Sequence, residues 1–317
     1  MIAPPRTRTL ALTRPLDLRL TLAPTRYGKG DPSCLLRSDE CYRATRTPDG
    51  PATVHLVVRG GELEAAAWGA GGAWALDQLP LLVGEHDDTS DFDPGEGIVA
   101  ELVRRHPGLR IGASHRVLEA LVPAVCAHRV SGYEGRRAHR QVMQAYGEPA
   151  PGPSDIELTV PPDPRVLAST SHQELHPLGL ERARADVIRR AAARAVTVES
   201  VVDQPPEEAE RRLRSIAGVG SWTAAVVRQV ALGDADAVPV GDDRSKHLVA
   251  WAFLGEPRGS DAQMLELLEP YRGHRGRVLR LLRAERPATE LVLEGRPGEV
   301  FEPMFLYRFL PAAGGGS

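Results

Sequence analysis

The chain has 317 residues, which is enough for two or three domains with well-buried cores. Its composition, 42% hydrophobic and 26% charged, is ordinary for a globular protein, and it contains no run of about eighteen apolar residues that could span a membrane. The formal net charge of -3 excludes binding of nucleic acid through overall charge alone.

The N-terminus and the cysteines predict a soluble protein of the cytoplasm. Residues 1–12 include arginines but no apolar stretch of signal-peptide length. The three cysteines, Cys34, Cys41 and Cys126, form neither a CxxC pair nor a Cys/His cluster. We therefore expect reduced thiols, no metal site, no iron–sulfur cluster and no association with a membrane.

The first third of the chain is predicted to be rich in β-structure. Residues 16–22 alternate leucine with polar side chains, and residues 53–59 form an apolar run of strand length. Turn-rich segments at 28–31 and 48–51 separate these stretches. An acidic, turn-rich stretch at 87–97 indicates a boundary, so we predict an antiparallel sheet domain over residues 1–96.

From residue 97 the pattern becomes helical. Residues 114–127 place apolar side chains on one helical face, with a kink expected at Pro123, and residues 180–195 form another amphipathic helix. A proline-rich loop covers 151–164. We predict a helical body over 97–284 and a tail over 285–317, whose apolar stretch 301–310 packs on the body or binds something else.

A hairpin between two helices is predicted over residues 206–232. Prolines and glutamates at 205–208 begin the first helix, which stops at Gly218, Val219 and Gly220, and Ser221 is expected to cap the second. Glycines expose backbone N–H groups that suit a phosphate oxygen, and the valine can plug into the helix pair. The same segment also fits an ordinary connection between helices.

The order of motifs resembles the helix-hairpin-helix DNA glycosylase superfamily, and within it the DNA-3-methyladenine glycosylase II family. Residues 216–224 resemble its hairpin, and residues 238–242, Val-Pro-Val-Gly-Asp, resemble its catalytic aspartate loop, here 234–243. Weaker matches lie at 106–110, 125–131 and 270–272. The resemblance covers roughly residues 97–283, and residues 1–96 are compatible with an accessory β-domain.

This resemblance implies an α+β fold in which the antiparallel sheet domain precedes a body of two helical subdomains. It implies hydrolysis of the N-glycosidic bond of alkylated purines, such as 3-methyladenine or 7-methylguanine, during base excision repair. Asp242 is then the catalytic carboxylate, which stabilises an oxocarbenium-like sugar. Alternatively, Asp242 or Asp243 only caps the helix predicted over 244–254.

Trp222 stands where strand-nicking relatives carry a lysine. Since tryptophan cannot form an imine, the resemblance predicts a glycosylase without lyase activity. Trp222 and Tyr271 are candidates to stack on a flipped base, with His128 and Val226 beside them. For Trp222, Tyr271 and His128 a structural role in or near the core is the alternative. The family has an aromatic residue where Val226 stands, so we hypothesise that bulkier adducts enter.

The expected partner is double-stranded DNA that contains damaged bases, bound by a monomer and, in a bacterium, within the nucleoid. Gly218, Val219, Gly220 and Ser221 would hold the backbone, and Arg129 would fill the gap left by the flipped base, unless it is a solvated arginine. No cofactor is expected, although the hairpin carbonyls allow a monovalent cation. Two further basic clusters could face phosphates: Arg136, Arg137, His139 and Arg140, and Arg272, His274, Arg275 and Arg277.

The sequence is also compatible with two other functions. One is a non-catalytic DNA-binding protein that retains the hairpin, and the other is a glycosylase for oxidised or bulky lesions. A pure binder would show affinity without releasing a base.

Overall fold

The computed structural model describes residues 4–285. Its contacts define two compact units, one formed by Met1–Asp87 with Gly108–Asp234 and the other by Asp88–Pro107 with the residues from Ala235 onward. The sheet and the hairpin belong to the first unit, whereas Asp242 belongs to the second. The predicted domain limits of 1–96, 97–284 and 285–317 stay a prediction, and the tail beyond residue 285 lies outside the described residues.

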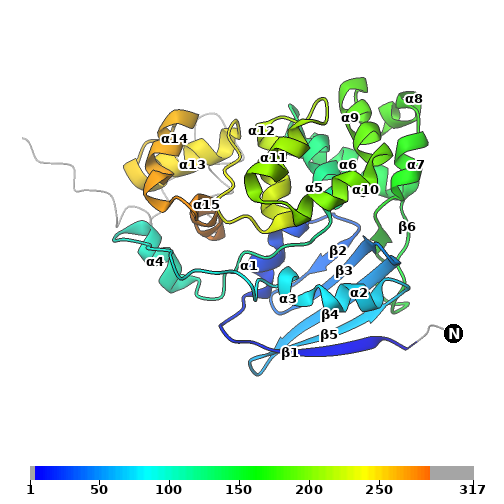
Figure 1. Cartoon of the computed structure of the whole chain (residues 1–317), viewed down its shortest axis with the longest axis horizontal. Helices are drawn as coiled ribbons and strands as arrows, with labels where there is room; N and C mark the ends of the chain where they lie inside the picture. Colours follow the sequence, from blue (N-terminus) through cyan, green and yellow to red (C-terminus); the bar gives the residue numbers. More distant parts are fainter. Residues whose placement is uncertain (1–3, 286–317) are drawn as a thin grey trace, which may run out of the picture. The chain divides into compact units, whose positions relative to one another are not determined.

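The first unit contains an antiparallel sheet of five strands in the order β1-β5-β4-β3-β2 (Figure 1). The strands are β1 (Arg6–Ala11), β2 (Cys34–Leu36), β3 (Glu40–Thr47), β4 (Gly50–Arg59) and β5 (Glu62–Trp68). The strand predicted at 53–59 is confirmed within β4. On one face Tyr42 stacks on His55 with ring centroids 4.0 Å apart, while the opposite face, which includes Cys41 and its cross-strand partner Leu56, is buried.

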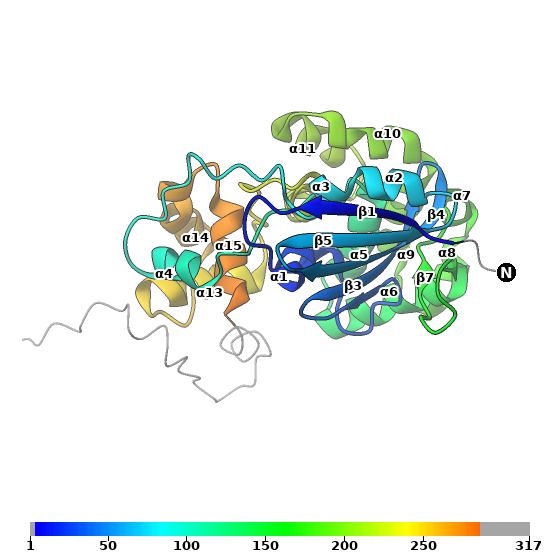
Figure 2. The ribbon, with the colours of Figure 1, turned by 90° about the horizontal axis from the view of Figure 1, so that it is seen from below.

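Short helices complete the core against the buried face of the sheet. They are α1 (Leu18–Leu22), α2 (Gly72–Asp77) and α3 (Leu79–Leu82), and Figures 1 and 2 show α2 and α3 lying along the sheet; η1 (Ala23–Thr25) follows α1 without buried residues. The strand predicted from the alternation at 16–22 is wrong. The Asp17 carboxylate caps α1 by accepting from the Leu20 N–H at 2.8 Å, and Leu18 and Leu22, four residues apart, share its buried face.

The helical part of the first unit is arranged around α5 (Val117–Ala127), which contains Pro123 and contacts α6, α9, α10 and α12. These helices confirm the helical segments predicted at 114–127 and 180–195. The proline-rich stretch follows β6 (Glu148–Pro149) and contains β7 (Thr159–Val160), and these two strands pair as a hairpin. The other elements are α6 (Gly132–Tyr146), α7 (Pro164–Ser169), α8 (His172–Leu175), η2 (His176–Leu178), α9 (Arg182–Ala193), α10 (Ala195–Glu199), η3 (Ser200–Asp203), α11 (Pro206–Arg214), α12 (Ser221–Val227) and η4 (Arg228–Leu232).

Two carboxylates fix α5 in place. Glu119 accepts from Arg43 and from the Thr45 hydroxyl of β3, and it also accepts from the backbone N–H of Arg46 at 2.8 Å. At the start of α5, Glu199 accepts from the N–H groups of Val117 and Leu118 at 2.8 and 3.1 Å. Since no side chain of the preceding residue caps α5, Glu199 satisfies donors that the helix itself cannot.

The second unit is helical. It comprises α4 (Ile98–Arg105), α13 (Asp243–Leu254), α14 (Asp261–Leu268), η5 (Glu269–Tyr271) and α15 (Arg275–Ala284), with α15 packed on α4 and α13. A sheet followed by two helical parts confirms the predicted α+β fold class. Within residues 4–285, no helix combines the length and apolar character that a membrane span requires.

Burial of His139 makes the stability of the first unit depend on pH. Burial lowers the pKa of His139 below its ordinary value of 6.5, an effect that Asp31 only partly opposes. The unfolded chain therefore binds a proton more readily than the folded one, so the free energy of unfolding should fall as the pH drops below about 6.5. A His139→Phe variant, which keeps a ring beside Tyr27, should show a smaller fall between about pH 7.5 and about pH 5.5 in urea unfolding. The same pH dependence in both proteins would contradict this assignment.

Candidate active site and nucleic-acid interface

The hairpin joins α11 to α12 through a turn that contains Gly218 and Gly220. The two glycines differ in backbone φ and in the space available for a side chain. Gly218 has a φ of +98°, and a Cβ there would lie 2.3 Å from the Val187 Cγ2 atom. Gly220 is exposed, its φ is −92°, and a Cβ would meet no atom within 4 Å. Val219 between them is buried against both helices. Gly218 therefore shapes the turn, while Gly220 leaves backbone open at the surface.

The predicted capping by Ser221 is wrong. Gly220 occupies the N-cap position of α12 without a side-chain hydrogen bond, and Ser221 is the first helical residue. A glycine N-cap cannot shield the first N–H groups of the helix with a side chain, so these groups remain open to an external acceptor. Beyond α12 the helix continues as the π-helical segment η4.

Trp222, Val226 and Val230 follow one another at four-residue intervals and line a single cavity of about 200 Å³ within the first unit. We call it the α5 cavity because α5 forms its long wall. Trp222 and Val226 are partly exposed, so neither is a fully buried core residue. The other lining groups come from α5, residues 114 and 116 before it, the segment 24–33, β3, α6, the 161–167 stretch and Glu199.

Asp242 lies in the second unit at the N-cap of α13, where its carboxylate accepts from the Ser245 N–H at 3.1 Å. The preceding Gly241 has a φ of +91°, which favours glycine and turns the chain into the helix. The capping role weighed as an alternative is thus present. It does not exclude chemistry, because the side chain is 21% exposed rather than sealed in the core.

Two further side chains hold Asp242, and sequence reasoning missed both. The Ser245 hydroxyl and the Arg283 guanidinium donate to Oδ2, the latter at 3.2 Å, and Arg283 also donates to the Ser245 hydroxyl at 2.6 Å. Ser245, three residues after the N-cap, could have been found from local spacing. Arg283 comes from α15 and leaves no local signal. In residues 4–285, all these contacts fall on Oδ2, so Oδ1 stays available.

The neighbouring acid has a different environment. Asp243 is exposed and accepts from Lys246 at 2.7 Å. This hydrogen bond lowers the pKa of Asp243 and raises the pKa of Lys246 above its ordinary value. Asp243 therefore lacks the fixed geometry of Asp242, and the Lys246 amine is held in its protonated form.

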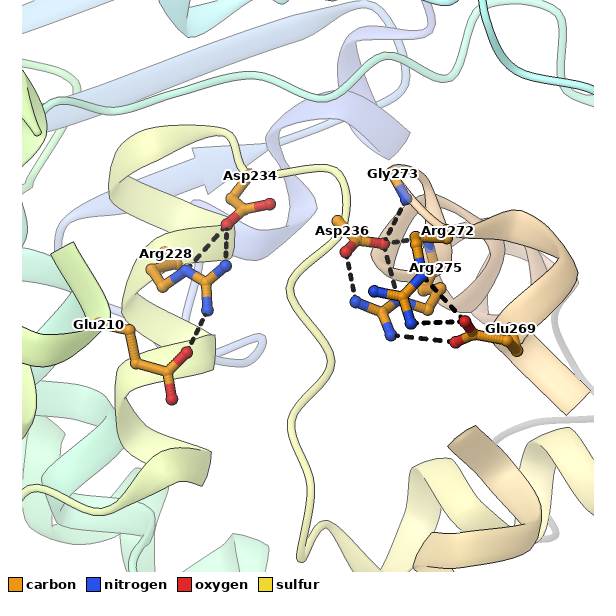
Figure 3. A network of polar contacts seen from close by, with 8 residues as sticks. All are labelled: Glu210, Arg228, Asp234, Asp236, Glu269, Arg272, Gly273 and Arg275. Atoms are coloured by element: carbon orange, nitrogen blue, oxygen red, sulfur yellow. Dashed lines mark hydrogen bonds and ion pairs between the residues drawn. The ribbon is translucent and has the colours of Figure 1, made fainter. Parts of the chain in front are cut away.

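Ion pairs hold Asp234 and Asp236, which lie at the start of the segment that leads from the hairpin helices to Asp242 (Figure 3). In the first unit Arg228 binds Asp234 and Glu210. In the second unit Asp236 accepts from Arg275 and, at 2.8 Å, from the N–H of Gly273. Burial would raise the pKa of Asp236, but the bonds from Arg275 outweigh it and leave this pKa lowered.

The remaining predicted pocket residues lie in contrasting places. Tyr271 ends η5 in an aromatic cluster with Phe92 and Phe253, at ring-centroid distances of 6.5 and 6.1 Å. His128 is the C-cap of α5, and burial followed by Arg129 lowers its pKa. Arg129 is exposed with a φ of +56°, a conformation that is uncommon outside glycine and concentrates at functional sites. Their roles toward a base or DNA stay predictions.

Both basic clusters place part of their side chains in the interior. His274 and Arg277 are buried, with the Arg277 guanidinium donating to the His274 ring at 3.0 Å and that ring bonded to Asp91. In the other cluster His139 is buried as well, and Arg140 donates to the Gly30 carbonyl at 3.2 Å. Fewer positively charged side chains are therefore exposed to phosphates than the histidine and arginine runs in the sequence predicted. Within residues 4–285 no cluster of three His, Cys, Asp or Glu side chains suits a metal.

Comparisons with known proteins agree with this architecture. No family model matches the chain. A segment of 131 residues is 30% identical to DNA-3-methyladenine glycosylase 2 of Escherichia coli (strain K12), covering 40% of this chain. The match spans 45% of that relative, less than half its length.

Solved structures extend the likeness to most of the chain. A 3-methyladenine DNA glycosylase from Archaeoglobus fulgidus matches with a TM-score of 0.74 and 18% identity, over 88% of this chain and 98% of the other. An 8-oxoguanine glycosylase/lyase from Clostridium acetobutylicum, in complex with DNA, matches with a TM-score of 0.66 and 11% identity, over 89% and 96%. The chain has the fold of these DNA glycosylases. Its predicted resemblance to the helix-hairpin-helix superfamily and to DNA-3-methyladenine glycosylase is confirmed.

The hairpin glycines should respond differently to alanine. Gly218→Ala adds a Cβ against Val187 at a positive φ, so we expect the free energy of unfolding to fall by about 2 kcal/mol or more. Gly220→Ala adds a Cβ in open space at an ordinary φ and should cost less than about 1 kcal/mol. Chemical denaturation of both variants measures the difference, and equal losses would refute the turn geometry described here.

Proposed function

We propose that the protein is a monofunctional DNA glycosylase that hydrolyses the N-glycosidic bond of alkylated purines of the 3-methyladenine or 7-methylguanine type. One observation carries the proposal. The Asp242 carboxylate, at the position where the sequence resembles a catalytic aspartate loop, is fixed through Oδ2 by Ser245 and Arg283, while Oδ1 accepts no hydrogen bond in the described part of the chain.

A fixed carboxylate suits the chemistry of this bond. As the base departs with the bonding electron pair, positive charge develops on the deoxyribose, and water adds at C1′ and loses a proton. A cationic alkylated purine leaves as a neutral base. Asp242 would stabilise the developing charge and orient the water without moving, because its own donors hold it before the substrate arrives.

The proposed DNA contacts come from the hairpin and from Arg129. The open N–H groups after Gly218, Val219 and Gly220, together with Ser221, would bind a phosphate without reading sequence. A monovalent cation on the hairpin carbonyls belongs to this proposal, although the Ala217 carbonyl already accepts from Arg190 at 2.9 Å. Binding to damaged double-stranded DNA by a monomer should weaken steeply with salt.

Strand cleavage is not part of the proposed reaction. An imine requires an unprotonated amine near the sugar, and Trp222 occupies the position after the hairpin where a lysine would serve. The sequence contains two lysines, Lys29 and Lys246. Lys246 lies next to the aspartate loop, but its bond to Asp243 raises its pKa and keeps it charged. The product should therefore be an abasic site in an intact strand.

Asp242→Asn should lower the release of methylated purines from duplex DNA by roughly 100-fold or more, because the neutral amide cannot balance the charge on the sugar. Asp243→Asn is the matched control and should retain most of the activity, since Asp243 is exposed and bound to Lys246. Free base is quantified by chromatography, and strand breaks are scored before and after alkali. Tight duplex binding by the wild type without base release would instead identify a non-catalytic binding protein, and breaks before alkali would identify a lyase.

Arg283 is predicted to be a positioning residue for Asp242. Arg283→Gln removes a charged donor from Oδ2, so single-turnover excision should slow by roughly 10- to 100-fold while the affinity for damaged duplex changes little. Arg283→Lys should restore part of the rate, because lysine also donates. Arg104→Gln, at an exposed arginine paired with Glu101, is the control. A parallel loss of affinity and rate would mean that Arg283 binds DNA instead.

A further inference from the structure

The α5 cavity is larger than the packing of the first unit needs. Protein interiors are close-packed, and voids above the size of a water molecule are few because their walls lose dispersion contacts. This cavity holds about 200 Å³ and is lined along α5 by Leu118, Val122 and Ala124, all buried. A space of this size and character suits an apolar occupant.

The acidic and arginine side chains on its walls already have partners. Arg43 is paired with Glu119, and Arg116 is paired with Glu199 at 3.2 Å. Asp31 accepts from the backbone N–H groups of Tyr27 and Ser33. Burial, only partly opposed by Arg116, raises the pKa of Glu199. The walls therefore favour an uncharged ligand.

Trp222 and Val226, from the helix that follows the hairpin, form part of the cavity wall. They lie one helical turn apart on the same face of α12, both line the cavity, and both are partly exposed. The tryptophan presents an aromatic surface for stacking. The small Val226 side chain leaves the space beside that surface open, whereas an aromatic residue at 226 would extend into it.

We infer that the α5 cavity receives the apolar, planar substituent of a bulky alkylated purine, and that Val226 is the residue that admits it. The inference rests on the proposed glycosylase function and names its substrate class: purines that carry an aryl or aralkyl group rather than only a methyl group. Trp222 stacks on the adduct, and the substituent contacts the apolar wall of α5.

The test compares N7-benzylguanine with N7-methylguanine at one position of the same duplex. The wild-type protein should release both. Val226→Phe should lower the release of benzylguanine at least about tenfold more than it lowers the release of methylguanine. Val196→Phe is the matched control, because Val196 is 88% exposed and lies outside the cavity. Urea unfolding of both variants verifies that each is folded.

A second measurement does not depend on catalysis. Toluene, as an isolated apolar ring, should raise the melting temperature of the wild type and of Asp242→Asn, but not that of Val226→Phe. Stabilisation by toluene without any base release would support the cavity and refute the proposed function. Release of methylguanine but not of benzylguanine by the wild type, or equal effects of the two phenylalanine variants, would overturn the inference while leaving the proposed function intact.

Discussion

The hydrogen bonds that converge on Oδ2 of Asp242 are the interaction on which the proposed chemistry depends. Ser245 and Arg283 give this carboxylate a fixed orientation in the free protein. The same group caps α13, so one side chain both starts a helix and presents an acid at its N-terminal end, where the helix dipole favours negative charge. The stability of the loop and the geometry of the acid are therefore determined together.

Carboxylates perform a comparable task in the first unit. Glu119 and Glu199 fasten α5 to the sheet and cap its start. These bonds satisfy polar groups beside an open space, so the α5 cavity can persist without unpaired carboxylates on its walls. The helix that anchors the sheet is thus also the wall of the proposed adduct site, which links the packing of the unit to its choice of substrate.

Patterns among residues that are close in the sequence were sufficient to predict much of the fold. The glycine pair and the amphipathic stretches predicted the hairpin and the main helices, because each of these depends on neighbouring residues, whereas the aspartate loop was predicted from the family resemblance. The same reliance on local pattern failed at residues 16–22, where a leucine alternation also fits one face of a short helix, and at Ser221, whose capping role belongs to Gly220. Arg283 and Glu199 act across long sequence separations, so no pattern in one sequence revealed them.

The proposed stabilisation of positive charge on the sugar by a prepositioned Asp242 carboxylate can be measured with a duplex in which a cationic pyrrolidine ring replaces the deoxyribose, compared with a duplex that carries neutral tetrahydrofuran. The wild type should bind the cationic analogue roughly 100-fold more tightly than the neutral one, and Asp242→Asn should bind both alike. An equal preference for the cation in both proteins would contradict this role of Asp242, and would place the source of charge stabilisation elsewhere in the molecule.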